Sequence, residues 1–354
     1  MDVFNPAALS FGSASPIDAY YDILQPLCIS GLRKALDPDA AIFNRQIRNG
    51  RIESTFGSED LTSTCICLIG IDRHGLEQGA LPASCRTILK SASSLARRRR
   101  YIGGFGLLAW ANAVHDDMEL DQLANEIGVS PTEDGLHDRL TTMELAWLLS
   151  GLLHEAHRTG KSRDRDRARA AACSLRERYS PSARVMNHAS VKAPFRHRMR
   201  GRIANFADQI YAVQAFAFST LVDADFLDVA NSLAQNLVDR QGSLGQWWWH
   251  YDARTGAPAE IYPVYSVHQH AMAPMAFMAL AAAGGRQFET ALARGLSWLG
   301  ANELGVDMVD QKAQTIWRDL HHCLAAELKI ESIVAEGDLV AVRYTERGTS
   351  RVAF

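Results

Sequence analysis

The alternation of two kinds of helical segment is the feature that most constrains this fold. From about residue 58 onward, apolar segments rich in small residues alternate with segments that are charged along one side. IGGFGLLAWANAV (102–114) is of the first kind, and RDRDRARAAACSLRERY (163–179) is of the second. A helix that is apolar all round is buried, whereas a helix with a polar face lies at the surface. The alternation therefore predicts two concentric layers of helices, as in an α/α toroid.

After a first helix over 18–36, the predicted helices span 61–71, 81–98, 102–115, 120–127, 141–157, 162–179, 206–222, 226–240, 263–283, 288–300 and 311–330. If the helix predicted over 311–330 is counted, the chain has six inner helices. The outer partner of this last inner helix is either missing or supplied by the N-terminal segment. An α-solenoid also alternates helices, but it repeats at a fixed period. The spacing here varies widely, which favours a closed ring. We therefore predict an all-α fold, an (α/α)6 toroid.

The predicted ring spans 58–330, with 1–57 as an extension packed on it and 331–354 as a tail. In the tail, β-branched residues alternate around Glu336-Gly337-Asp338, which predicts a short hairpin or an extended strand. A second departure from helix is expected at 245–260. There the stretch GQWWWHYDARTG alternates and ends in a turn signal, which predicts a β-hairpin-like excursion.

Composition excludes several functional classes. The formal net charge of −3 gives no general electrostatic drive toward nucleic acid or an anionic membrane. The most apolar stretch, 272–283, is too short for the roughly 20 residues of a membrane span. The N-terminus lacks the basic start and apolar run of a secretory signal, so we expect a cytoplasmic protein. Cys65-x-Cys67 lacks a second pair at zinc spacing, so no metal and no cofactor are expected.

Polar residues at the starts of the inner helices indicate where a ligand binds. Inner helices of a toroid run parallel, so their N-termini, with partial positive charge and free N–H groups, gather at one end. Asn205, Asp208 and Tyr211 share one face of an otherwise apolar segment. Buried unsatisfied polar groups are costly, so a wet cavity explains all three, although capping also explains Asn205. Glu144 follows two candidate capping threonines, Thr141 and Thr142, at the start of the inner helix predicted over 141–157.

The aromatic block over 245–270 supplies the other candidates. Tryptophan and tyrosine present flat apolar faces that suit sugar rings. Trp247 and Trp249 are expected to anchor the excursion, with Trp248 pointing the opposite way toward a ligand. His268 and Tyr265 are candidates for proton transfer, although a single histidine entering an apolar helix more often has a structural role. Further candidates for ligand binding are His250, Tyr251, Asp252, Arg254, Gln269 and His270.

Two other stretches interrupt the pattern. Residues 178–203 are basic and irregular, which marks either a functional loop or a flexible insert. The acidic run 115–121 (HDDMELD) superficially resembles the magnesium motif of terpene synthases. It follows one helix and precedes another at a polar turn, and no second motif follows it downstream. A solvated turn is the favoured interpretation.

The blocks NFADQIYAVQAFA (205–217), GQWWWHYDARTG and EIYPVYSVHQHAMAPMAFMAL (260–280) resemble the six-hairpin α/α-toroid superfamily. They are most similar to poorly characterised members found with bacterial polysaccharide genes, and the resemblance covers roughly 58–330. The superfamily includes glycoside hydrolases, polysaccharide lyases, sugar epimerases and, on a related toroid, terpene cyclases, so the fold does not decide the function.

For a hydrolase, the resemblance implies two carboxylates, Asp208 with Asp252 or Glu144. For a lyase or epimerase, it implies proton abstraction by Tyr211, Tyr265 or His268, with the basic loop 192–202 holding a uronate. The leading hypothesis is a carbohydrate-active or oligosaccharide-binding protein without a cofactor. A non-catalytic interaction scaffold with a vestigial pocket is the second. The third is an isoprenoid diphosphate enzyme using Asp116 and Asp117, against which the missing Asp-x-Asp-Asp motif counts.

Overall fold

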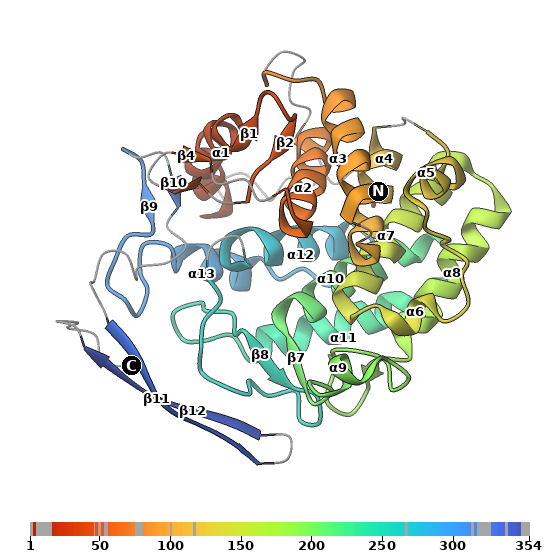
Figure 1. Cartoon of the computed structure of the whole chain (residues 1–354). Coiled ribbons are helices and arrows are strands. Elements are labelled where there is room, and N and C mark those ends of the chain that lie inside the picture. The colour runs from red at the N-terminus through yellow and green to blue at the C-terminus, as the bar shows by residue number, and fades with distance from the viewer. Residues whose placement is uncertain are drawn as a thin grey trace.

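The computed structural model describes residues 3–4, 16–45, 47–48, 51–52, 56–74, 81–99, 101–115, 118–265, 268–312, 315–316, 327–336 and 339–347. Within these ranges, helices form two layers around a ring (Figure 1). The inner helices are α2 (Ser58–His74), α4 (Ile102–Val114), α7 (Thr142–Thr159), α10 (Phe206–Phe218) and α12 (Ala273–Ala282). Each inner helix contacts the next one in this order. The outer helices are α3 (Cys85–Arg99), α5 (Leu120–Ile127), α8 (Ser162–Arg176), α11 (Phe226–Asp239) and α13 (Glu289–Ser297).

Burial follows the predicted alternation. Every residue of α10 is buried, and so is every residue of α4 from Gly103 to Ala113. The outer helix α8 instead buries one stripe, which is Asp164, Ala168, Ala171, Ala172 and Leu175. The apolar side chains of the inner layer therefore form the core, as hydrophobic patterning requires. The predicted all-α toroid is confirmed, and no helix among the described residues is long and apolar enough to cross a membrane.

The ends of the ring differ from the prediction. Helix α1 (Pro16–Ala35) contacts α13, as an outer helix supplied by the N-terminal segment would. The helix predicted over 311–330 is wrong wherever the structure describes that stretch. β9 (Val309–Asp310) pairs with β10 (Thr315–Ile316), and β11 (Glu327–Glu336) pairs with β12 (Leu339–Arg347). Both strands of the β11–β12 hairpin are rich in β-branched residues, which favour strands.

The hairpin expected in the tail is thus confirmed, and it begins before residue 331, inside the range predicted for the ring. Figure 1 shows it at the edge of the molecule. Shorter antiparallel pairs are β1 (Leu36–Asp37) with β2 (Ile42–Phe43), β3 (Ile47–Arg48) with β4 (Arg51–Ile52), and β5 (Tyr179–Ser180) with β6 (Val185–Met186).

The excursion at 245–260 forms its main pairing with another part of the chain. β8 (His250–Asp252) pairs with β7 (Ile203–Asn205), the strand at the C-terminal end of the basic segment. Single bridges join Trp248 to Pro263 and Tyr251 to Pro258. Pro263 and Val264 are held extended against this excursion, so they do not belong to the helix predicted over 263–283, in which the π-helical turn His268–Met272 precedes α12. The remaining short helices are α6 (Leu136–Arg139), α9 (Phe195–Arg198) and the 3₁₀ turn Ser219–Leu221.

Two glycines let α4 and α7 approach closely. A Cβ at Gly106 would lie 2.3 Å from the backbone nitrogen of Leu148, and one at Gly151 would lie 2.6 Å from the carbonyl oxygen of Gly106. The backbones of α4 and α7 are therefore in direct contact, which no larger residue permits. This contact sets how the starts of the two helices sit against each other.

Aromatic rings fill the interior near the C-terminal ends of the inner helices. Trp110 of α4 and Phe218 of α10 lie 5.6 Å apart between ring centroids, although α7 separates their helices along the ring. His154 of α7 contacts both rings at 4.9 and 4.8 Å, and Phe4 from the N-terminal segment packs against His154 at 4.9 Å. These contacts pack rings from three inner helices and the N-terminal segment against one another at that end.

Candidate functional site

The inner helices α2, α7 and α10 each carry a carboxylate in the third position of their first turn. Glu144 forms a capping box with Thr141, and Asp208 forms one with Asn205. Asp60 accepts a hydrogen bond from the Gly57 N–H at 3.3 Å. Capping boxes satisfy N–H groups that a helix start leaves unpaired. The capping alternative for Asn205 is thus confirmed, and these acids gather at the end where the inner helices begin, which we call the entry end.

Asp208 does more than cap its helix. It is fully buried, and its Oδ2 accepts hydrogen bonds from the Asn205 N–H at 3.0 Å and from His188 Nδ1 at 2.8 Å. Its Oδ1 accepts a bond from the Met143 N–H at 3.1 Å, which joins α10 to the start of α7. A carboxylate only accepts hydrogen bonds, so His188 Nδ1 is the donor and carries a proton. Asp208 therefore selects the tautomer of an imidazole at the entry end.

His188 belongs to the basic segment, and the chain around it is attached to two inner helices. The Thr142 N–H donates to the His188 carbonyl at 2.8 Å. Gln209 of α10 accepts a bond from the Met186 N–H at 2.7 Å and donates to the Met186 carbonyl at 3.1 Å. These bonds attach this part of the basic segment to the entry end of α7 and α10.

Arg178 lies buried behind the same group. Its guanidinium donates to Thr142 Oγ1 at 3.2 Å and to the His137 carbonyl at 2.5 Å, and only 4% of the residue is exposed. Burial lowers the pKa of Arg178 to about 10, while the charge of Asp208 acts to raise it. The guanidinium is therefore still a cation at neutral pH, and it balances the buried carboxylate.

Glu144 is held from three sides at the start of α7. Its Oε1 accepts a bond from the Tyr101 hydroxyl at 3.0 Å, and its Oε2 accepts bonds from the Thr141 N–H and hydroxyl at 2.8 Å each. Gly103 makes room for it, because a Cβ there would lie 2.0 Å from Glu144 Oε1. Burial, and then Glu144, raise the pKa of Tyr101, so Tyr101 stays a hydrogen-bond donor.

His197 faces the same group from the far end of the basic segment. Its ring centroid lies 6.3 Å from that of His188. Burial, followed by the charge of Arg196, lowers the pKa of His197, so its ring is neutral at pH 7. The entry end of α7 and α10 thus brings together two imidazoles, two carboxylates and a buried arginine.

Tyr211 lies one turn deeper and packs edge-on against Trp147, with ring centroids 5.3 Å apart. Burial raises the pKa of Tyr211 to about 12. The phenol is therefore protonated at neutral pH and can donate a hydrogen bond.

A second group forms at the start of α12. The rings of Trp249 and His268 lie 4.6 Å apart, and both residues are partly exposed. His268 Nδ1 lies 3.2 Å from the Tyr265 carbonyl, and the Tyr265 ring packs on Trp298 at 5.6 Å. Trp248 points away, as alternation predicted, but toward α11, where its Nε1 donates to the Arg240 carbonyl at 2.6 Å. Trp249, not Trp248, is thus the tryptophan beside His268.

The other predicted binding residues are buried or paired. Gln269 accepts from the Trp247 N–H at 3.1 Å and donates to two glycine carbonyls at 2.9 Å each, so it braces the excursion. Tyr251 is fully buried, and His270 is 9% exposed. His250 and Asp252 lie on the rim. His250 Nδ1 contacts Glu260 at 2.5 Å.

Asp252 pairs with the exposed Arg254 at 2.6 Å. The hydrogen bond from Arg254 lowers the pKa of Asp252, which makes this carboxyl a poor proton donor.

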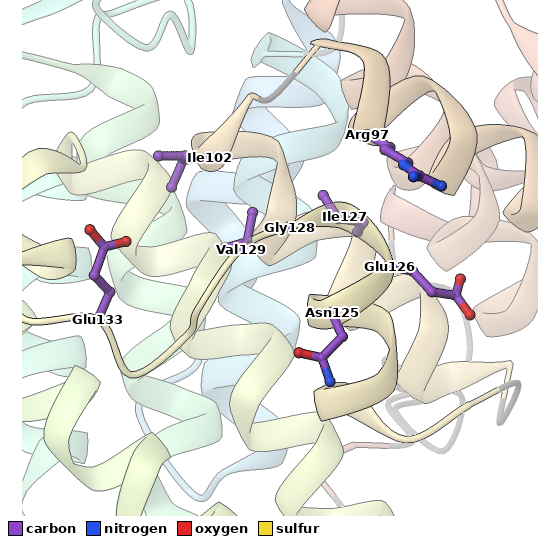
Figure 2. A pocket seen from close by; sticks show the side chains of 8 residues that line it. All are labelled: Arg97, Ile102, Asn125, Glu126, Ile127, Gly128, Val129 and Glu133. Carbon is purple, nitrogen blue, oxygen red and sulfur yellow. The ribbon is translucent and has the colours of Figure 1, made fainter.

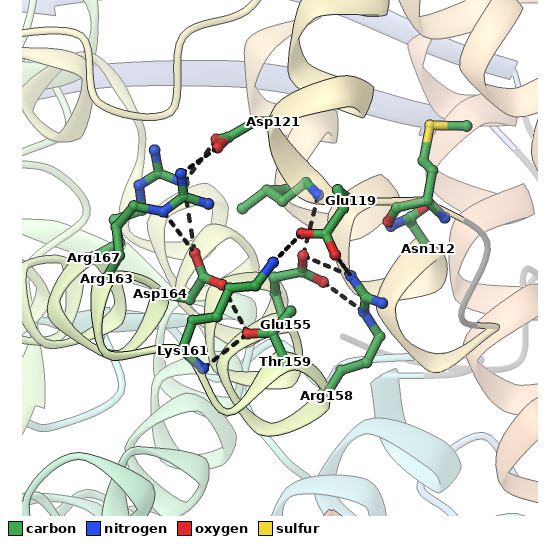
Figure 3. Close-up of polar contacts among 12 residues, drawn as sticks. Asn112, Glu119, Asp121, Glu155, Arg158, Thr159, Lys161, Arg163, Asp164 and Arg167 are labelled. Carbon is green, nitrogen blue, oxygen red and sulfur yellow. Dashed lines mark hydrogen bonds and ion pairs between the residues drawn. The ribbon is translucent and has the colours of Figure 1, made fainter.

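Glu119 and Asp121 of the acidic run belong to a group of polar contacts with residues 155–167 (Figure 3). Asp116 and Asp117 lie outside the described residues. Glu119 pairs with Lys161 at 2.7 Å, and Asp121 pairs with Arg163 at 2.8 Å and Arg167 at 2.7 Å. These carboxylates are neutralised by cations at the start of α8. That arrangement is typical of a surface charge network.

Two hollows are found on or beside α3. One of about 540 Å³ is bounded by the end of α3, the start of α4 and the turn after α5, and Figure 2 shows its lining from Arg97 to Glu133. Another of about 420 Å³ lies against α3, beside Phe56 and Lys90. Neither hollow is lined by a residue that the sequence singled out for ligand binding.

Sequence reasoning missed His188, His197, Arg178 and Tyr101 as members of the site. His188 and Asp208 are 20 residues apart and share no helix, so no periodicity links them. The available signal was the basic stretch itself, because a long irregular segment between regular helices is often functional.

Comparison with known proteins identifies the fold. No protein-family model and no curated protein matches the sequence, whereas solved structures do. An unsaturated glucuronyl hydrolase from Bacillus sp. GL1, responsible for glycosaminoglycan degradation, aligns with a TM-score of 0.57 at 16% identity, covering 86% of this chain and 90% of that one. A sugar epimerase from a ruminal bacterium aligns with a TM-score of 0.59 at 14% identity, covering 84% and 90%.

An unsaturated glucuronyl hydrolase mutant from Streptococcus agalactiae, complexed with dGlcA-GalNAc6S, aligns with a TM-score of 0.57 at 10% identity, covering 90% and 87%. At such identities the likeness establishes the fold, which is an (α/α)6 toroid.

Proposed function

We propose that this protein is a carbohydrate-active enzyme that transfers a proton to or from a saccharide at the entry end of the toroid. The observation that carries the proposal is the hydrogen bond of 2.8 Å between His188 Nδ1 and the buried Asp208. An imidazole oriented by a carboxylate presents its second nitrogen as a base near neutral pH. In this proposal His188 is the catalytic residue, and Asp208 is a positioning residue that acts through it.

Proton abstraction from carbon, as in an epimerase or lyase, fits the site better than hydrolysis. A hydrolase uses one protonated and one ionised carboxyl group on either side of the scissile bond. Asp208 is occupied by three hydrogen bonds, and Asp252 is held ionised by Arg254. His188 Nε2 is instead suited to accept a proton from a carbon next to a carbonyl or carboxylate group, which would leave an enolate on the sugar.

A saccharide also fits the aromatic residues at the start of α12. Trp249 and His268 are partly exposed and offer flat faces of the kind that pack on sugar rings. The solved structures of the same fold include a sugar epimerase and enzymes named for glucuronyl substrates, which supports a sugar ligand. Tyr265 and Tyr211 remain candidates for contacts to this ligand, and action without a cofactor, in the cytoplasm, remains a prediction.

The proposal is tested by incubating the protein with a panel of neutral and acidic saccharides in D₂O. Epimerisation by proton abstraction incorporates deuterium at the reacting carbon, detected by NMR. A lyase instead releases an unsaturated product that absorbs in the ultraviolet. New reducing ends without deuterium or unsaturation would point to hydrolysis, with Glu144 as the carboxylate to examine, and would contradict the proposed chemistry. Binding without turnover across the panel would favour the scaffold hypothesis.

His188→Gln is expected to lower turnover of the substrate found in this way by roughly 10²- to 10⁴-fold, the usual contribution of a general base. The melting temperature should change little, because the backbone bonds of this segment remain. His157→Gln is the matched control, since His157 stacks on Phe4 at the opposite end of the ring. Equal turnover in both variants would remove His188 from the mechanism.

A further inference from the structure

The outer part of the basic segment combines positive charge with exposed apolar side chains. Residues 191–202 read VKAPFRHRMRGR, and no acidic residue occurs between Glu177 and Asp208. Lys192, Arg196, Arg198, Arg200 and Arg202 are all exposed. The chain as a whole has a net charge of −3, so this positive charge is a local feature.

The apolar residues of the segment are unusually open to solvent. Val191 is 87% exposed, Phe195 71% and Met199 63%. They recur at every fourth position around the short helix α9, with a basic residue directly after each of them. Large exposed apolar side chains that cluster in this way mark an interaction surface.

A second loop extends this surface. Ile261 is 76% exposed and Tyr262 44%. Arg200 lies 3.2 Å from His250 Nε2, and His250 Nδ1 contacts Glu260, the residue before Ile261. Figure 1 shows α9, β7 and β8 together along one edge of the molecule. We call residues 191–202 with 261–262 the basic-apolar rim.

We propose that the basic-apolar rim docks this protein on an anionic membrane surface. Arginine and lysine are attracted to anionic headgroups, and exposed valine, phenylalanine, methionine and isoleucine side chains can enter the boundary with the acyl chains. A soluble anionic glycan or a nucleic acid would use the same positive charges, but it offers no apolar phase for aliphatic side chains. The combination of both kinds of side chain therefore favours a lipid surface.

Docking in this way would hold the entry end close to the membrane. The rim follows His188 along the chain and includes His197, and β7 leads from it into α10. The proposal concerns where the protein acts and does not depend on which reaction it performs.

The test is co-sedimentation of the full chain with vesicles of phosphatidylcholine, with and without phosphatidylglycerol. We expect binding only when phosphatidylglycerol is present, and weaker binding as salt is raised. The triple variant Arg196→Gln, Arg198→Gln, Arg200→Gln should partition roughly a hundredfold more weakly. The matched control replaces Arg97, Arg98 and Arg165, which are exposed on α3 and α8, with glutamine and should bind like the wild type.

A second triple variant, Val191→Ser, Phe195→Ser, Met199→Ser, keeps every charge and should lower partitioning about tenfold. Wild-type partitioning by this variant would overturn insertion of the rim. If the control variant and the rim arginine variant lost vesicle binding equally, binding would depend on the overall charge of the protein and not on the rim, and the proposal would be wrong. If the wild type binds heparin but no vesicle, the rim is a glycan-binding surface and the membrane proposal is wrong. Circular dichroism of each variant separates these results from unfolding.

Discussion

Replacing Asp208 with alanine is expected to lower the free energy of unfolding by about 3–5 kcal/mol, as when one partner of a buried ionic pair is removed. The change would leave the Met143 N–H, the Asn205 N–H and His188 Nδ1 without their acceptor, and it would remove the charge that most favours the cationic form of the buried Arg178. Urea unfolding followed by circular dichroism measures the loss. A loss below about 1 kcal/mol, the size of one ordinary hydrogen bond, would contradict this account.

Asp208→Asn separates the two roles of this side chain. The amide oxygen can still accept the Met143 N–H although the Asn205 N–H loses its acceptor, so we expect less destabilisation than in Asp208→Ala. The amide nitrogen, however, would donate to His188 Nδ1, which forces the proton onto Nε2 and removes the base. A tautomer switch of this kind costs about 10⁴-fold in turnover in the serine-protease triad. A stable Asp208→Asn variant with full turnover would show that Asp208 has only a structural role.

Gly106→Ala is the second change with a large expected effect. The new Cβ would lie 2.3 Å from the Leu148 nitrogen and 2.6 Å from its Cα, so α4 and α7 must separate. Backbone cannot rotate away as a side chain can, so we expect about 3 kcal/mol of destabilisation, the upper part of the usual range for overpacking. Thermal and urea unfolding measure this loss.

Gly70→Ala is the matched control, because it lies within α2 and a Cβ there meets nothing within 4 Å. It should stabilise the protein by about 0.5–1 kcal/mol through helix propensity alone. Because Gly106 and Gly151 meet across the same contact, the double alanine variant should lose less than the sum of the two single losses. Full additivity would indicate that the two glycines do not share one contact.

Much of the ring could be predicted because its helices are defined by local patterns. The helix predicted over 120–127 matches α5, and the Asn205-x-x-Asp208 spacing that suggested a polar face is a capping box at the start of α10. The β-branched alternation around Glu336 likewise predicted the hairpin of β11 and β12. Each of these features depends on side chains a few residues apart, which helix and strand geometry brings together without help from the rest of the chain.

In the described parts of 311–330 the predicted helix was wrong because helix propensity there competes with pairing between strands. ELKIESIVAE, the sequence of β11, contains residues that are compatible with a helix, but its partner LVAVRYTER binds it as a strand. The propensity of a β-strand depends on its cross-strand neighbours, so a short segment does not reveal it by itself. The delayed start of α12 has the same origin, because Pro263 is held by Trp248.

The sequence by itself determined the two-layer helical ring, the capping acids at the starts of α7 and α10, and a basic segment between them. Only the tertiary structure decided that this segment turns His188 onto Asp208, that Trp249 rather than Trp248 meets His268, and that Gln269 braces the excursion. The physical reason is the range of the interactions. Burial patterns and caps are local, whereas a hydrogen bond between a loop and a helix 20 residues away exists only once the ring has formed.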